Sequence, residues 1–213
     1  VTTTNHTDQD RHVEILNHIT KQFGPIEDTI SETVPGSRVS VTIHIIPPSV
    51  NKDFVTLVTT GMSDEPMDYS DEERTFKYAE LLLKLPSSWV VEKDNMKDPN
   101  HYWPFGWLRN VAHIPHLYDG WLEEGVILPN GEPPQPFASN TKLSCVMICR
   151  PQESGLANVH TRDKDINMYT LVPIYEEERK LALEKGYEYL LERMNEKGIT
   201  DVLDINRINV GMQ

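Results

Sequence analysis

The chain has 213 residues, and its 38% hydrophobic content is enough for one compact domain with a real core. The 33 acidic side chains outnumber 20 basic ones, and a formal charge of −13 repels phosphate backbones, which argues against direct binding of nucleic acid. No uninterrupted apolar stretch approaches the roughly 18 to 20 residues that cross a bilayer, so a membrane-spanning protein is excluded.

The N-terminus is polar and lacks the basic start and apolar stretch of a signal peptide, so the expected location is the cytoplasm. We expect a single domain over residues 1–213, with residues 1–9 flexible or trimmed. Residues 8–24 have apolar side chains at helical spacing and end at Gly24-Pro25, which predicts an amphipathic helix against the core.

Three strands are predicted next. Residues 39–46 alternate apolar and polar side chains, which is typical of a strand with one buried face, and residues 54–60 are rich in Val and Thr. The short segment between them favours an antiparallel hairpin. Residues 78–86 are good helix formers but form a short run that ends in proline. Alternation of polar and apolar side chains leads us to predict a strand there.

Two helices and two further strands follow. Residues 103–118 are predicted to form a helix that is opened by Pro104 and interrupted before Pro115. The proline-rich residues 128–136 predict a surface loop, and strands are expected around residues 142–149 and 166–173. Residues 174–197 predict a long C-terminal helix that contains Gly186 and ends at Gly198.

The two cysteines, Cys145 and Cys149, share one face of a predicted strand. At about 3.3 Å per residue they lie about 13 Å apart, too far for a disulfide, whose Cα atoms are about 4.4 to 6.8 Å apart. Buried reduced thiols are therefore expected. A zinc site is disfavoured because there is no second cysteine pair and no histidine at zinc-finger spacing.

Sequence motifs give little support to catalysis. The chain lacks the GxSxG, GxxxxGK[ST] and GxGxxG patterns that nucleophile-elbow hydrolases, phosphate-binding NTPases and Rossmann oxidoreductases require. His113 and His116 could share a helix face, but Pro115 lies between them and no HExxH motif is present. We therefore predict no catalytic residue, no metal and no cofactor. A metal-dependent hydrolase that uses residues 101–116 stays open as an alternative.

The loop over residues 59–68 is the best candidate for a binding surface. It leaves a strand through a glycine and combines methionine with carboxylates, and we expect these side chains to be exposed. Two acidic residues after the second predicted helix are also expected to attract a basic partner. The predicted partner-binding residues are Met62, Asp64, Glu65, Asp68, Glu123 and Glu124.

Several short motifs, in order along the chain, resemble the bacterial suppressor-of-fused domain family. They include IHIIPP at residues 43–48, LVTTGMSD at residues 57–64, YAEL at residues 78–81 and WP at residues 103–104. Further along come PNG at residues 129–131, PFASNTKL at residues 136–143, LVPIYEEE at residues 171–178 and VLDINR at residues 202–207. The resemblance therefore extends over most of the chain.

The resemblance implies an α+β fold with a mixed, largely antiparallel sheet flanked by helices, and no known catalytic activity. Bacterial members are thought to be immunity proteins that neutralise toxins of polymorphic toxin systems, so the expected partner is a protein such as a basic toxin domain. Animal members regulate Hedgehog signalling and hold a transcription-factor peptide as an added strand, with a second domain for which this chain is too short. Their peptide-binding residues are not reproduced here, so a scaffold that captures an extended peptide is the alternative.

Overall fold

The computed structural model describes residues 7–67, 77–92 and 96–212. The helices are α1 (Asp8–Phe23), α2 (Pro99–Tyr118), α3 (Glu176–Lys185) and α4 (Tyr187–Glu196), with 3-10 turns η1 (Met62–Asp64) and η3 (Val210–Met212). The strands are β1 (Asp28–Ile30), β2 (Thr42–Ile46), β3 (Phe54–Thr60), β4 (Tyr78–Pro86), β5 (Ile127–Pro129), β6 (Cys145–Cys149), β7 (Asn158–His160) and β8 (Asp165–Ile174). No helix of the described chain is long and apolar enough to cross a membrane.

The strands form one sheet in the order β1-β2-β3-β4-β8-β6-β5, and β7 pairs with the free half of the β8 edge. Among the described strands, all pairings are antiparallel except that of β4 with β8, which is parallel. The predicted α+β class, the β2–β3 hairpin and the strand at residues 78–86 are thereby confirmed.

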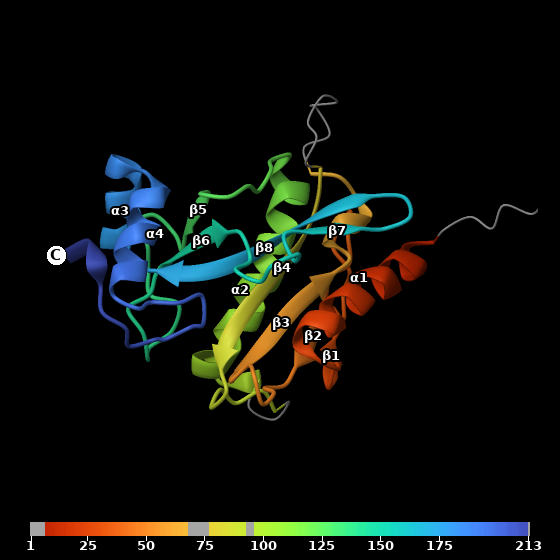
Figure 1. Ribbon diagram of the computed structural model, residues 1–213. Helices are drawn as coiled ribbons and strands as arrows, with labels where there is room; N and C mark the ends of the chain where they lie inside the picture. Colours follow the sequence, from red (N-terminus) through yellow and green to blue (C-terminus); the bar gives the residue numbers. More distant parts are fainter. Residues whose placement is uncertain (1–6, 68–76, 93–95, 213) are drawn as a thin grey trace, which may run out of the picture.

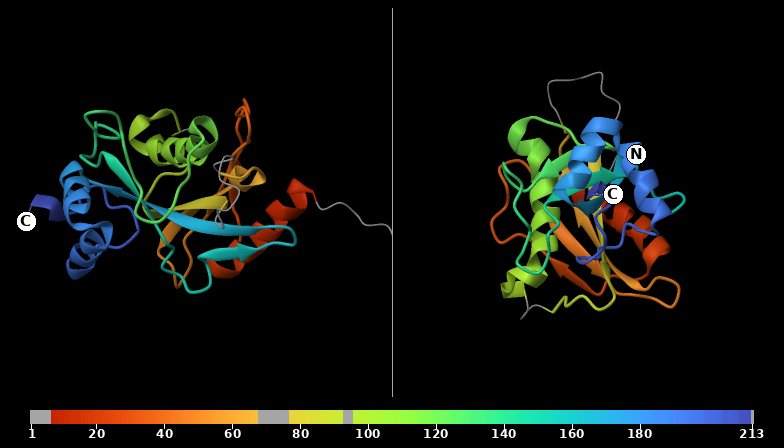
Figure 2. Two further views of the ribbon diagram at one scale, coloured as in Figure 1. Left: turned by 90° about the horizontal axis from the view of Figure 1, so that it is seen from above. Right: turned by 90° about the vertical axis from the view of Figure 1, so that its left-hand side faces the viewer.

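Helices cover both faces of this sheet (Figures 1 and 2). The apolar side chains of α2 pack with those of the central strands on one face. On the opposite face, α1 packs on Ile166 and Met168 of β8, and α3 and α4 pack on Val172 and Ile174 of the same strand. The sheet is therefore the middle layer of three.

The predicted strand at residues 39–46 was given one buried face, and this is wrong. Ile43 and Ile45 are buried on the α2 side, but His44 and Ile46 are buried as well, with 7% and 1% of their surface exposed. The reason is that the cluster around α1 covers the second face. Alternation of polar and apolar residues thus predicted the strand, but it did not predict that the face with the polar side chains is buried as well.

The predicted helix over residues 174–197 is divided at Gly186. This glycine has φ +94°, a value that an α-helix cannot contain, and its backbone N–H closes α3 by donating to Ala182 O at 2.8 Å. Leu183, in the last turn of α3, is 69% exposed.

The second predicted helix ends at Tyr118 as expected, but α2 begins earlier, at Pro99, and continues through Pro104 and Pro115 without the predicted interruption. A proline at position 104 cannot donate to the carbonyl of Asn100 four residues earlier. That carbonyl instead accepts a hydrogen bond from Asn140 Nδ2 at 3.3 Å. A side chain from a distant loop thus satisfies the group that the proline leaves unpaired.

Candidate functional site

Hydrogen bonds to a buried carboxylate fix the turn that follows β3. Glu80 of β4 has no exposed surface, and it accepts hydrogen bonds from Ser63 N at 2.9 Å, Ser63 Oγ at 2.7 Å and Thr59 Oγ1 at 2.6 Å. Burial raises the pKa of this carboxyl, while these donors act in the opposite direction. Gly61 opens the turn at φ +103°, where an added Cβ would collide with Ser40 O.

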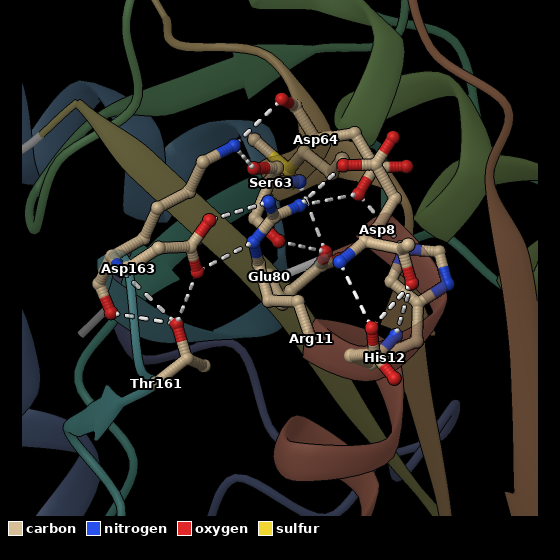
Figure 3. Close-up of polar contacts among 12 residues, drawn as sticks. Asp8, Arg11, His12, Ser63, Asp64, Glu80, Thr161 and Asp163 are labelled. Atoms are coloured by element: carbon tan, nitrogen blue, oxygen red, sulfur yellow. Dashed lines mark hydrogen bonds and ion pairs between the residues drawn. The ribbon is translucent and has the colours of Figure 1, made fainter. Parts of the chain in front are cut away.

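Above this turn lies the Arg11 cluster, which we define as Asp8, Arg11, His12, Asp64, Asp163 and Lys164 (Figure 3). The guanidinium of Arg11 lies 2.7 Å from Asp163 Oδ2, 2.8 Å from Asp8 Oδ1 and 3.2 Å from Asp64 Oδ1. On the other side, His12 Nε2 lies 2.8 Å from Asp64 Oδ1, a contact that raises the pKa of His12.

The Arg11 cluster joins three distant segments of the chain. Arg11 and His12 come from α1, Asp64 from the 3-10 turn, and Asp163 from the loop between β7 and β8 (Figure 3). Lys164 completes it by donating to Ser63 O at 3.1 Å and to Asp64 O at 2.7 Å. The contacts of the Arg11 cluster lie within the chain, so the first effect of the cluster is to fix α1 and the β7–β8 hairpin to the 3-10 turn.

The structure therefore changes the view of the loop over residues 59–68. Met62 and Met67 were expected to be exposed, but their exposed fractions are 0% and 1%, so this expectation is wrong. Met62 O accepts a hydrogen bond from His116 Nε2 at 3.1 Å, and Met67 Sδ accepts one from Leu122 N at 3.4 Å, which fixes both residues beneath α2 and its following segment.

The carboxylates of this loop differ in their surroundings. Asp64 keeps 19% of its side chain exposed and is already paired with Arg11 and His12. Glu65 is exposed, whereas Asp68 lies outside the described residues. The methionine surface that was predicted here is absent from the described loop.

The other two predicted residues, Glu123 and Glu124, directly follow Leu122, whose backbone N–H donates to Met67 Sδ of this loop. Glu123 is exposed and makes no side-chain hydrogen bond or ion pair with any described residue, whereas Glu124 Oε2 lies 2.6 Å from Arg150 Nε. Both line a pocket of about 310 Å³ beside β7 and β8. Glu123 and Glu124 thus share one pocket, with unlike roles.

Two buried ion pairs were missed by sequence analysis. Lys84, 2% exposed, lies 2.6 Å from both Glu153 Oε1 and Asp201 Oδ2. Glu178, fully buried, lies 2.6 Å from Arg207. Both join segments that are far apart in sequence. Lys84 gave a signal as a charge in a largely apolar strand, whereas Glu178 lies in a run of charged residues and gave none.

The histidine region proposed for a hydrolase contains separate contacts. His113 Nε2 lies 2.6 Å from Glu32 Oε1, and His116 is buried, which lowers its pKa. Within the described residues, no three His, Cys, Asp or Glu side chains come together as a metal site. Burial raises the pKa of Cys145 to about 11 and that of Cys149 to about 12, so both thiols stay protonated and are poor nucleophiles at neutral pH.

Comparison with known proteins agrees with the fold and these motifs. The family profile of "Suppressor of fused protein (SUFU)" matches residues 37–208, which is most of the chain. The chain belongs to the suppressor-of-fused family. The match begins after α1, and it includes the turn at Asp64 and the Glu178–Arg207 ion pair. No curated protein sequence matches the chain.

Solved suppressor-of-fused structures share the fold at low sequence identity. A SUFU homologue from Neisseria gonorrhoeae FA 1090 has a TM-score of 0.69 and 17% identity, with 95% of this chain and 97% of that chain covered. The structure of a Sufu–Fu complex gives 0.68 and 13%, with coverage of 97% and 93%. Drosophila Suppressor of Fused gives 0.64 and 13%, and the match covers 93% of this chain but 50% of that one. The family is one of protein-interaction domains, as the complex with Fu illustrates.

Proposed function

We propose that this family member is a non-catalytic binding protein that acts as an immunity protein and neutralises a toxin of a polymorphic toxin system. Support for protein binding comes from family membership and from the similarity to a suppressor-of-fused structure that contains a protein partner. The observation that favours a basic partner is the formal charge of −13. A field of that sign speeds association with a cationic protein and repels nucleic acid.

The structure strengthens this electrostatic argument, because many of the positive groups are already paired within the protein. Among the described residues, arginines within 4.0 Å of a carboxylate oxygen include Arg11, Arg38, Arg109, Arg150, Arg179 and Arg207. Lys84 is buried between two carboxylates. Among the described residues, the buried carboxylates are Glu80, Glu178 and Asp201, against the buried cations Arg11 and Lys84. The acidic excess therefore lies largely on the surface, where a basic partner would meet it.

The first test is functional. The tagged chain is used to capture proteins from its native host, and each captured protein is expressed in a susceptible bacterium with and without this chain. We expect one basic partner to arrest growth alone and to be tolerated when this chain is co-expressed. We also expect its association rate to fall as salt is added, because salt screens exposed charges.

Growth arrest that co-expression fails to relieve would refute the immunity function. A captured partner that is harmless, and that binds through a short extended segment, would instead favour the peptide-capturing scaffold. Stoichiometric metal in the purified protein, together with hydrolysis of a substrate, would favour the hydrolase. The same preparation thus separates the three functions.

A further inference from the structure

The pocket beside Glu123 arises from a gap in the sheet. β8 is paired with β7 through residues 165–167 and with β6 through residues 170–174, so Tyr169 falls between the two partner strands. The segment that carries Glu123 and Glu124 closes one side of this gap, and Tyr187 at the start of α4 lies at another. The resulting pocket has a volume of about 310 Å³, near the lower end of known ligand sites.

One wall of the pocket depends on a glycine. Gly125 has φ +90°, and a Cβ added there would lie 2.5 Å from a ring carbon of Tyr187. The absence of a side chain at Gly125 therefore lets the ring of Tyr187 pack against the backbone beside the two glutamates. The phenol ring of Tyr169 lines the same pocket from the sheet.

Tyr169 is the observation that marks the pocket as a binding site. Its side chain is 7% exposed, and its hydroxyl makes no hydrogen bond with any described residue. The hydroxyl is not one of the fully enclosed polar atoms, so it opens into the pocket, where a ligand or water can hydrogen-bond to it. Burial raises the pKa of this hydroxyl, and the nearby carboxylate of Glu123 raises it further, so the hydroxyl is neutral.

The charges in the pocket select a cation. Glu124 is paired with Arg150 at 2.6 Å, so the one positive group in the lining is already compensated. The carboxylate of Glu123 has no such partner among the described residues. An anion would face an uncompensated carboxylate, whereas a cation would meet it together with two tyrosine rings.

We infer that this pocket receives the side chain of one arginine of the protein partner, an inference that rests on the proposed function. A guanidinium group is planar, stacks on aromatic rings and presents several N–H donors in one plane. It can donate to the carboxylate of Glu123 and to the hydroxyl of Tyr169 while its plane contacts a tyrosine ring. A lysine ammonium has the charge but lacks the planar group, so arginine is preferred.

The test uses Nα-acetyl-arginine amide as the probe and backbone amide NMR of the full chain as the measurement. We expect saturable shifts at residues 123–125 and 167–169, weaker binding of Nα-acetyl-lysine amide, and none by the neutral citrulline analogue. Glu123→Gln should weaken binding of the arginine probe roughly three- to tenfold, and Tyr169→Phe should weaken it by a similar factor. Glu184→Gln removes the same charge from an exposed site on α3 and should bind as the wild type does.

Two outcomes would overturn the inference. One is the absence of saturable shifts in this region, and the other is equal binding of the citrulline analogue or of the Glu123→Gln variant. Thermal unfolding of each variant is compared with the wild type so that a folding defect is not read as lost binding. Because the probe needs no toxin, specific arginine binding supports the pocket even if no toxin is found. A captured toxin that binds the Glu123→Gln and Tyr169→Phe variants as tightly as the wild type refutes the pocket alone.

Discussion

His44 should make the free energy of unfolding depend on pH. It is 7% exposed, and its ring nitrogens lie 3.2 Å from Thr29 Oγ1 and 2.8 Å from Thr60 Oγ1. Burial, with a smaller contribution from His12, lowers its pKa from 6.5 to about 4. Between these values the unfolded chain binds a proton that the folded chain does not, so stability falls as the pH falls through this window.

The size of the effect follows from the difference in pKa. One unit corresponds to about 1.36 kcal/mol, so acidification from pH 6.5 to about 5 should remove roughly 2 kcal/mol through His44. Below about pH 4 both states are protonated and this loss is complete. His12 has the opposite sign, because Asp64 raises its pKa: its contribution is fully present below its unfolded pKa and is lost as the pH rises through its folded pKa.

The assay is urea unfolding, followed by tryptophan fluorescence over this pH range, for the wild type and for His44→Gln. Glutamine offers a donor and an acceptor to the two threonine hydroxyls but does not titrate. The stability of the wild type relative to the variant should fall by about 2 kcal/mol between pH 6.5 and about 5. His160→Gln, at a side chain that is 77% exposed, is the control. Parallel profiles for the wild type and His44→Gln would refute the reasoning.

Three further predictions concern stability and reactivity. Lys84→Met should cost about 3–5 kcal/mol in urea unfolding because it leaves two carboxylates uncompensated, whereas Lys142→Met, on the surface, should change stability by less than about 0.5 kcal/mol. Gly186→Ala should destabilise by about 1 kcal/mol or more, while a gain of about 1 kcal/mol would show a continuous helix. Cys145 and Cys149, with pKa values raised to about 11 and 12, should react with a thiol reagent at about pH 8 only as the chain opens, and rapid labelling of the native protein would contradict their burial.

The predictable parts of the fold were those with a local cause. Alternating side chains gave β2, and helical spacing together with Gly24-Pro25 gave α1 with its observed end at Phe23. Gly186 was placed inside a predicted helix, because its positive φ cannot be read from its identity alone. Pro104 was predicted to open the second helix, because only the folded chain shows that Asn140 bonds the carbonyl of Asn100, which the proline leaves without its helical donor.

The candidate site was harder to predict, because its character is set by contacts between distant residues. Asp64 appeared in sequence as an exposed carboxylate, and only packing of α1 brings Arg11 and His12 to it. Met62 sits in a loop, yet its burial follows from α2 above it. The sequence did not mark Tyr169 as a site residue, because tyrosine is common in strands and only the folded sheet shows that it lies between two partner strands.

The parallel pairing of β4 with β8 has a consequence for how the chain acquires its structure during synthesis. β4 ends at Pro86 and β8 begins at Asp165, so this parallel pair joins two segments that are separated in the chain by α2, β5, β6 and β7. Closing so long a loop is entropically costly, and contacts of this range slow folding. During synthesis on the ribosome the edge of β4 stays unpaired until Thr170 has emerged, and a chain released before that point would expose this edge to other strands.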